Sequence, residues 1–352
     1  MIAKGSFSND CRSGINDLLR GKNLSSSVIE RLFHGILSDD AELSDEESVL
    51  LSGLLVALTM KGESVHELVG AAKAMRHHAR RIQVIGSPVV DIVGTGGDSL
   101  DTFNISTTSA FVAAGAGLIV AKHGNRAASG CCGSADVLER CGVNLDMEPE
   151  RVEESVAEHG IGFLFARNFH PAMRRVASLR KRLGIRTLFN LLGPLTNPAG
   201  AGCVLLGVYA PQLTEMFAET LNRLGCRRAM VVHGYDGMDE LTVTTCSRVT
   251  ELIDGRIRTY DFFPELYFGG ELADPKELRG GDAAENAETL RGILSGTIQD
   301  ARRNIVLLNS GAAIYCAGKS ENLKEGIRIA AESIDTGTAL DKLNRLIEHS
   351  TI

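Results

Sequence analysis

Apolar residues recur at helical spacing through roughly the first 80 residues of the chain. One such apolar stripe consists of Val28, Ile29, Leu32, Phe33 and Ile36. This spacing puts the apolar side chains on one side of a helix, so the segment is expected to pack against neighbouring helices.

Two S-x-x-E pairs mark helix starts in the same region. Ser44 with Glu47 precedes an apolar run that stops at Gly62, and Ser64 with Glu67 precedes the next run. In such capping boxes the serine and the glutamate satisfy backbone N–H groups that a helix start leaves unpaired. The sequence therefore predicts a helical N-terminal domain, residues 1–85, without a cluster of chemically active side chains.

The pattern changes at Pro88, where a short β-branched run is followed by a glycine turn, a helical stretch and a second such run. Strand, helix and strand in this order form a βαβ unit, which favours a parallel sheet covered by helices. Asp254-Gly255, between two alternating runs, predicts a hairpin. The sequence thus predicts an α/β domain, residues 86–352, with a mainly parallel central sheet. Its expected strands are 88–93, 118–124, 202–209 and 228–234, and its expected helices are 105–117, 211–225, 304–318 and a helical run at 322–347.

Charge and cysteine content restrict the class of protein. The 352 residues include 44 acidic and 37 basic side chains, a net charge of −7, which argues against a protein that coats nucleic acid or an anionic membrane. The longest apolar run, 110–121, is too short to span a bilayer, and the N-terminus has no apolar signal-peptide core. The eight cysteines contain no C-x-x-C pair, which favours reduced thiols in a soluble cytoplasmic protein.

Glycine is in excess, 38 of 352 residues or about 11% against a usual value of about 7%. Three of these glycines lie in the turn Gly94-Thr95-Gly96-Gly97-Asp98, which follows the first predicted strand. Backbone N–H groups of such a turn can converge on an anion, and hydroxyl and amide side chains follow at the start of the next helix, where phosphate is favoured. The alternative is a tight strand-to-helix turn with ordinary capping. We expect a phosphate cradle, and no Gly-Lys-Ser/Thr follows that would make it a Walker loop.

A second loop rich in glycine and hydroxyl groups follows the second predicted strand, over residues 122–134. Lys122 and Arg126 supply positive charge there, and Asn125 supplies both a donor and an acceptor. Open α/β sheets bind ligands at the carboxyl ends of their strands. Two such loops after neighbouring strands therefore predict one common ligand site.

Two charged segments offer further candidates. Six basic residues and no acid occur between His170 and Asn190, and most of them are expected on a solvated helix face, with one or two reaching a site. A guanidinium there would suit a carboxylate ligand. Asp239 and Glu240 follow another predicted strand and could hold Mg²⁺, although acidic turns are common without a metal.

Seven motifs in order make the chain resemble the anthranilate phosphoribosyltransferase family of tryptophan biosynthesis. They are DIVGTGGD, TFNIST, AKHGNR, GSADVLE, FHPAMRRV, GIRTLFNLLGPLTNPA and DELTV. The resemblance covers essentially the whole chain. It implies the fold shared with pyrimidine nucleoside phosphorylases, a helical domain completed by a segment near 170–200, and a homodimer formed through the helical domain.

The resemblance also implies site residues. Those expected to bind phosphoribosyl pyrophosphate are Gly94, Gly97, Asp98, Thr102, Asn104, Ile105, Ser106, Thr107, Lys122, His123, Gly124, Asn125, Arg126, Ala127, Ala128, Ser129, Gly130 and Ser134. Those expected to contact anthranilate are Gly94, His123, Asn125 and Arg180, with Arg180 on the carboxylate. Ser106, Asp239 and Glu240 are expected to bind two Mg²⁺ ions per monomer. Gly130 stands where the family often has serine, so a hydroxyl contact to phosphate is lost there if that contact uses the side chain.

The implied reaction is displacement of pyrophosphate from C1 of the ribose by the anthranilate amine, giving N-(5-phosphoribosyl)anthranilate in the second step from chorismate to tryptophan. The aryl amine already carries a free lone pair at pH 7, so no single general base and no covalent intermediate are expected. Rate would come from stabilising the leaving pyrophosphate and aligning the amine. Two alternatives are a pyrimidine nucleoside phosphorylase and a non-catalytic nucleic-acid-binding paralogue.

Overall fold

The computed structural model describes residues 4–38, 42–86, 88–97, 100–127 and 132–351, which group into two compact units. The first unit contains the described residues up to Arg80 together with Phe169–Pro198, and the second contains Arg81–Asn168 and the described residues from Ala199 onward. The division thus falls after Arg80, whereas the sequence placed it at residue 85.

The first unit is helical, and both expected capping boxes are confirmed. Ser44 Oγ accepts the N–H of Glu47 while the Glu47 carboxylate accepts the N–H of Ser44, and Ser64 and Glu67 repeat the arrangement. The helix that begins at Ser44 ends at Gly62, whose φ of 85° suits glycine. The helices of this unit are α1 (Lys4–Leu19), α2 (Ser26–Leu37), α3 (Asp45–Lys61), α4 (Val65–His77), α9 (Arg174–Leu183) and α10 (Leu188–Leu192).

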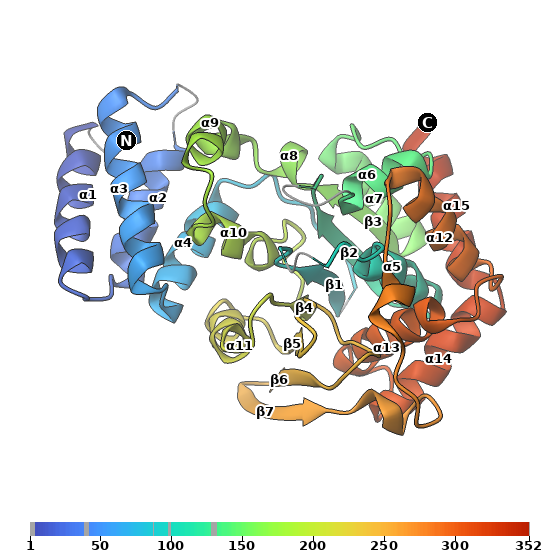
Figure 1. Cartoon of the computed structure of the whole chain (residues 1–352). Helices are drawn as coiled ribbons and strands as arrows, with labels where there is room; N and C mark the ends of the chain where they lie inside the picture. Colours follow the sequence, from blue (N-terminus) through green and yellow to red (C-terminus); the bar gives the residue numbers. More distant parts are fainter. Residues whose placement is uncertain (1–3, 39–41, 87, 98–99, 128–131, 352) are drawn as a thin grey trace. The chain divides into compact units, whose positions relative to one another are not determined.

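The segment 169–198 joins the N-terminal helices through buried polar and aromatic contacts. The Arg175 guanidinium donates to the carbonyl oxygens of Gly35 and Ile36 at the end of α2 and pairs with Glu47 at 3.2 Å. A cation at the C-terminal end of a helix is favoured by the helix dipole. Phe189 packs on Phe33 with ring centroids 5.3 Å apart, and α9 and α10 lie beside the blue helices (Figure 1).

The second unit is built on a seven-stranded sheet with the order β3-β2-β1-β4-β5-β6-β7. Neighbours from β3 to β5 pair in parallel, and the last two strands pair antiparallel, so the mainly parallel sheet is confirmed. The expected hairpin at Asp254-Gly255 is also present, with φ values of 44° and 83° that match a two-residue turn of this kind. The strands are β1 (Val89–Gly94), β2 (Ile119–Gly124), β3 (Ile161–Phe165), β4 (Cys203–Gly207), β5 (Arg228–Gly234), β6 (Ser247–Ile253) and β7 (Arg256–Phe262).

The strand order reverses between β1 and β4. From β1 the chain passes through α5 (Ile105–Gly115) to β2 on one side, whereas β4 leads through α11 (Leu213–Arg223) to β5 on the other. Since parallel crossovers are right-handed, α5 and α11 cover opposite faces of the sheet. The carboxyl ends of β1 and β4 therefore form a topological switch point, where α/β sheets place their ligands.

Sequence reasoning missed the fully buried strand β3 at one edge of the sheet and joined two C-terminal helices into one run. That run divides at Gly337, whose φ is 78°. In the described residues no helix is both long and apolar enough to cross a membrane, and the seven described cysteines are free thiols. The remaining helices are α6 (Ser134–Arg140), α7 (Pro149–His159), α8 (Ala166–Phe169), α12 (Ala283–Leu294), α13 (Ala301–Cys316), α14 (Leu323–Asp335) and α15 (Thr338–Thr351), with short 3₁₀ turns at Pro171–Met173, Gly193–Leu195, Pro264–Leu266 and Pro275–Leu278.

Candidate functional site

Asp239 lies against the ends of β1 and β4, at the topological switch point. Gly94 and Gly207 are paired neighbours in the sheet register, and both face Asp239. A Cβ atom at Gly94 would overlap the Asp239 carboxylate, and one at Gly207 would overlap its backbone carbonyl. Both glycines are therefore needed for the loop after β5 to cross the end of β4 and reach the first glycine turn.

The first glycine turn holds this carboxylate directly. The N–H of Gly96 donates to Asp239 Oδ2 at 2.7 Å, and the N–H of Thr95 donates to the Gly207 carbonyl at 2.9 Å. Gly96 and Gly97 have φ values of 66° and 82°, a conformation that favours glycine. The turn thus brings a candidate metal-binding carboxylate to a candidate phosphate loop, while Asp98 lies outside the described residues.

The start of α5 presents mostly backbone groups. Ile105 and Thr107 are buried, so their contribution to an anion site would come from main-chain N–H groups at the helix start. Ser106 is half-buried, and its Oγ accepts a hydrogen bond from Lys122 Nζ at 3.4 Å. Thr102 forms a backbone bridge with Arg279 just before the helix.

Asn104 ties the two glycine loops together. It sits at the N-cap position of α5, but its side chain makes no capping bond. Its Nδ2 donates to the carbonyl of Cys132 at 3.2 Å, and its Oδ1 accepts from Asn286 Nδ2 at 3.1 Å. The first loop, the second loop and α12 are thereby held by one amide side chain.

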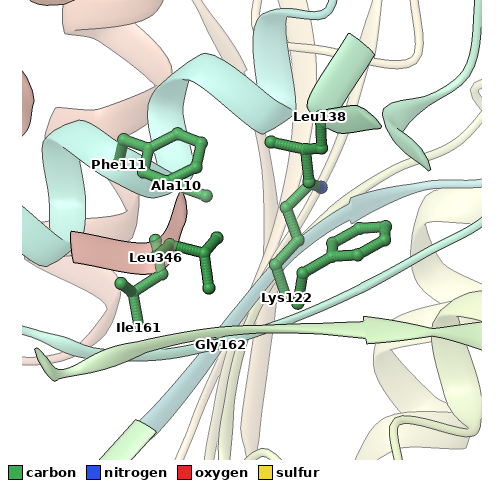
Figure 2. Close-up of a pocket in the computed structure, with 8 residues that line it drawn as sticks. Ala110, Phe111, Lys122, Leu138, Ile161, Gly162 and Leu346 are labelled. Carbon is green, nitrogen blue, oxygen red and sulfur yellow. The ribbon is translucent and has the colours of Figure 1, made fainter. Parts of the chain in front are cut away.

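Lys122 is buried beneath the loops. Its Nζ donates to the Ile92 carbonyl at 2.6 Å, and its pKa is lowered by burial, against which the carboxylates of Asp91, Glu240 and Asp239 favour the charged form. A small cavity beside its stem is lined by carbon atoms from α5, α6, β3 and α15, and in Figure 2 the lysine nitrogen is the only heteroatom among the side chains drawn as sticks. This cavity is a small packing defect of the core, lined by apolar atoms and the stem of Lys122.

The second loop is tied to its own strand and helix. The N–H of His123 donates to the buried Asp91 carboxylate at 3.1 Å, and Ser134 Oγ donates to the Asn125 carbonyl at 3.2 Å. A Cβ atom at Gly124 would overlap Ser134 Oγ, and one at Gly133 would overlap the backbone of residues 125–127. Ala128, Ser129 and Gly130, which were expected to bind phosphate, lie outside the described residues.

Arg126 forms ion pairs with neighbouring carboxylates. Its guanidinium bonds Glu139 through both terminal nitrogens at 2.8 Å and Asp136 at 2.9 Å. Asp136 also accepts the N–H groups of Ala127 and Gly133, at 3.0 and 2.9 Å. Burial opposes ionisation of Asp136, but these backbone bonds and the Arg126 contact bring its pKa below the usual value. A phosphate would therefore compete with two carboxylates for Arg126.

The acidic loop after β5 is fixed from two directions. Asp236 accepts hydrogen bonds from the hydroxyls of Thr242 and Thr244 and from the N–H of Met238. Asn309 on α13, which is fully buried, accepts the N–H of Leu241 at 3.1 Å and donates to its carbonyl at 2.8 Å. These contacts hold the backbone on both sides of Asp239 and Glu240.

Arg180 belongs to the first unit, on α9. Its guanidinium lies 5.4 Å from the centroid of the Phe189 ring, and burial lowers its pKa. Among the described residues, no carboxylate offsets this shift. A half-buried guanidinium in this state favours an anionic ligand, whereas Arg175 in the same basic stretch is bound to its own unit.

Three contributors to the site escaped sequence reasoning, namely Gly207, Asp136 and Asn309. Gly207 lies near the end of the predicted strand 202–209, and Asp136 is at the N3 position of a capping box that starts at Gly133, so both positions gave a weak local signal. Asn309 lies inside an apolar helix, and only its burial among polar backbone groups shows its role.

The pairing of a helical bundle with this α/β unit defines a class of glycosyltransferase. The model of the glycosyl transferase family helical bundle domain matches residues 12–79, and that of the same family's a/b domain matches residues 86–340. Together they cover most of the chain.

Relatives that match almost the whole chain show which family of glycosyltransferases it resembles. Anthranilate phosphoribosyltransferase of Desulfosudis oleivorans is 54% identical over 334 residues, covering 95% of this chain and 97% of the relative. The crystal structure of the Thermus thermophilus enzyme of this name is 44% identical, with a TM-score of 0.89 over 96% of this chain and 99% of that one. The Saccharomyces cerevisiae enzyme in complex with PRPP and Mg is 30% identical, with a TM-score of 0.88 over 97% and 98% of the two chains. The chain belongs to the anthranilate phosphoribosyltransferase family.

Proposed function

We propose that this chain transfers the phosphoribosyl group of phosphoribosyl pyrophosphate to the amine of anthranilate. The observation that carries the proposal is the meeting of Asp239 with the glycine turn at the ends of β1 and β4, beside a second glycine loop. An acidic side chain beside loops built for phosphate suits a substrate whose pyrophosphate is handled with a divalent cation. The function of the family relatives agrees with it.

Asp239, Glu240 and Ser106 fit Mg²⁺ by the chemistry of their donors, two carboxylates and a hydroxyl. Bound Mg²⁺ would offset the charge that develops on the leaving pyrophosphate. We propose two ions per protomer, as the resemblance implies. Asp239 and Glu240 favour the charged form of Lys122 against the effect of burial, and that charge would lie next to this metal site.

The other proposed site residues would bind the phosphate groups and orient anthranilate. N–H groups of the Gly94–Gly97 turn and of the start of α5 would hold phosphate oxygens, together with the second loop. Asn125, His123 and Gly94 would position the anthranilate ring, and Arg180 its carboxylate. Because the aryl amine attacks with its free lone pair, alignment replaces proton abstraction as the main requirement.

We also propose that the protein is a cytoplasmic homodimer that pairs through its helical domain. Val49 and Met60, which share one face of α3, are 71% and 83% exposed, and Leu19 at the end of α1 is 74% exposed. Exposed apolar side chains gathered on packed helices favour a protein interface. Sedimentation of the wild-type chain beside a Val49→Lys, Met60→Lys variant tests this, and an unchanged dimer would contradict the helical interface.

The activity is tested by following the loss of anthranilate fluorescence in the presence of phosphoribosyl pyrophosphate and Mg²⁺. The expected result is a loss that requires both the second substrate and the metal. Fluorescence that stays constant, or phosphate-dependent cleavage of a pyrimidine nucleoside in its place, would contradict the proposal.

The metal assignment predicts a second result. Asp239→Asn combined with Glu240→Gln should lower kcat and raise the Mg²⁺ concentration needed for half-maximal rate, because both carboxylate charges are removed. The control is Glu271→Gln, which removes an exposed carboxylate charge outside this loop. A double variant with the wild-type Mg²⁺ response would refute the site.

A further inference from the structure

Two histidines and a glutamate meet at the opposite end of the sheet from the glycine loops. His159 is the last residue of α7, followed by Gly160 with φ of 72° and then by the start of β3. His349 lies in the last turn of α15, which packs on α7 (Figure 1). The glycine loops follow the carboxyl ends of β1 and β2, whereas this cluster adjoins the amino end of β3, so the cluster is separate from the candidate transferase site.

Three ligand atoms of this cluster converge. His159 Nε2 lies 3.2 Å from His349 Nδ1, and Glu158 Oε2 lies 3.8 Å from the first nitrogen and 3.9 Å from the second. Ligands at 2.0–2.1 Å from a tetrahedral Zn²⁺ ion are about 3.3 Å apart. The two nitrogens already have this separation, and the exposed glutamate needs only a small rotation to complete the set.

The tautomer of His349 suits metal binding. Its Nε2 lies 3.0 Å from the backbone carbonyl of Arg151, which can only accept a hydrogen bond, so this nitrogen carries the hydrogen. In the neutral ring, Nδ1 then presents its lone pair toward His159. A ligating histidine whose other nitrogen donates to a backbone carbonyl is the usual arrangement at protein metal sites.

Lys342 holds the backbone at His159, and the basic side chains near the cluster already have acidic or carbonyl partners. Lys342 Nζ donates to the His159 carbonyl at 2.5 Å, and Arg345 Nε donates to Asp341 at 2.6 Å. Arg151 Nη1 pairs with Glu154. These contacts engage the basic side chains around the two imidazoles and leave the ligand atoms of the cluster facing one another.

We propose that Glu158, His159 and His349 form a structural site for a divalent transition metal, with Zn²⁺ the best match to two imidazoles and one carboxylate. Three protein ligands leave a fourth position for water. On binding, the metal replaces the hydrogen that lies between the two imidazole nitrogens, and His159 carries its N–H on Nδ1. The ion would link the end of α7 to the C-terminal helix α15.

The test uses the full-length protein freed of metal with EDTA and titrated with cobalt(II) chloride, then with zinc chloride. Cobalt bound by imidazoles in four- or five-coordinate geometry absorbs far more strongly in the visible than octahedral, oxygen-bound cobalt. We expect an intense band that saturates at one equivalent per chain, that zinc abolishes, and that accompanies a zinc-dependent rise in Tm. A wild-type protein without such a band overturns the proposal.

Two variants locate the metal. The Glu158 side chain is 64% exposed, so Glu158→Gln should fold normally, and His159→Gln removes a ligand that is 17% exposed. Each should weaken cobalt binding at least about tenfold and abolish the zinc-dependent rise in Tm. A band that persists unchanged in both variants overturns the site.

Two control variants test whether the metal binds elsewhere in the protein. His34 Nδ1 and His78 Nε2 are 3.0 Å apart in the first unit, so His34→Gln removes a similar histidine pair. That variant and the Asp239→Asn, Glu240→Gln variant should keep the band. Loss of the band in either control would place the metal elsewhere and contradict the proposal. Transferase activity plays no part in the readout, so the result stands apart from the proposed function.

Discussion

Single residues at the switch point decide whether the site can form. Gly94 and Gly207 lie side by side at the ends of two parallel strands, and Asp239 occupies the space that their missing side chains leave. The glycine excess is therefore partly explained by close packing of one loop on another. Only some of the glycines lie in the turns that are proposed to bind a ligand.

Gly207→Ala should damage the site more than the fold. The new methyl group would push the Asp239 backbone away from the glycine turn, at a cost of about 1–3 kcal/mol in the free energy of unfolding. We expect a higher Mg²⁺ requirement and a lower kcat in steady-state assays. The control is Gly202→Ala, where a Cβ atom would meet open space. Equal kinetics of the two variants would contradict the packing argument.

Arg180→Ala should raise KM for anthranilate roughly ten- to a hundredfold, because a hydrogen bond to a charged group contributes about 1.5–3 kcal/mol. KM for phosphoribosyl pyrophosphate should change little. Arg182→Ala removes an exposed cation of the same helix and serves as the control. An unchanged KM for anthranilate in Arg180→Ala would show that the carboxylate binds elsewhere.

At the scale of elements, the second loop depends on the helix that follows it. Asp136 in the first turn of α6 accepts two loop N–H groups and pairs with Arg126. Helix and loop thus form one hydrogen-bonded unit at the end of β2. The described loop residues Ala127 and Gly133 are thus held in place by Asp136, which would lower the ordering cost of binding a phosphate there.

Asp136→Ala should loosen this unit. Loss of the cap is expected to cost about 1 kcal/mol and to raise KM for phosphoribosyl pyrophosphate several-fold. Glu139→Ala is the matched control, since Glu139 pairs with Arg126 but accepts no loop N–H among the described residues. Thermal denaturation and initial rates measure both effects, and a larger KM effect in the control would argue against the capping role.

For the whole molecule, buried histidines set the response to acid. Burial lowers the pKa of His170 from 6.5 to about 4, with a hydrogen bond to the Thr196 backbone opposing the shift. Burial also lowers the pKa values of His34, His78 and His159. The unfolded chain therefore binds more protons than the folded one below pH 6.5, and stability falls as the pH drops toward 4.

His170 alone should contribute up to about 3 kcal/mol of this loss between pH 6.5 and 4. In His170→Gln the decline of Tm over this range should be shallower than in the wild type. His66→Gln, at an exposed histidine, should keep the wild-type slope. If His170→Gln follows the wild-type curve, the histidine is not held neutral in the folded protein.

Much of the fold was predictable because its signals are local. The serine–glutamate capping boxes, the stop at Gly62 and the turn at Asp254-Gly255 each follow from a few adjacent residues, and all are confirmed. Strand β3 was missed because five buried residues between two helices carry no alternating pattern. The two C-terminal helices merged in the prediction because a single glycine is a weak helix stop.

The sequence by itself determined the kinds of element, the two glycine loops and, through its ordered motifs, the enzyme family. Only the tertiary structure decided which residues meet. Asp239 reaches Gly94 because β4 lies between β1 and β5 and ends in glycine, and His159 meets His349 because α15 packs on α7. Local sequence controls backbone conformation, whereas contacts between distant segments depend on strand order and packing.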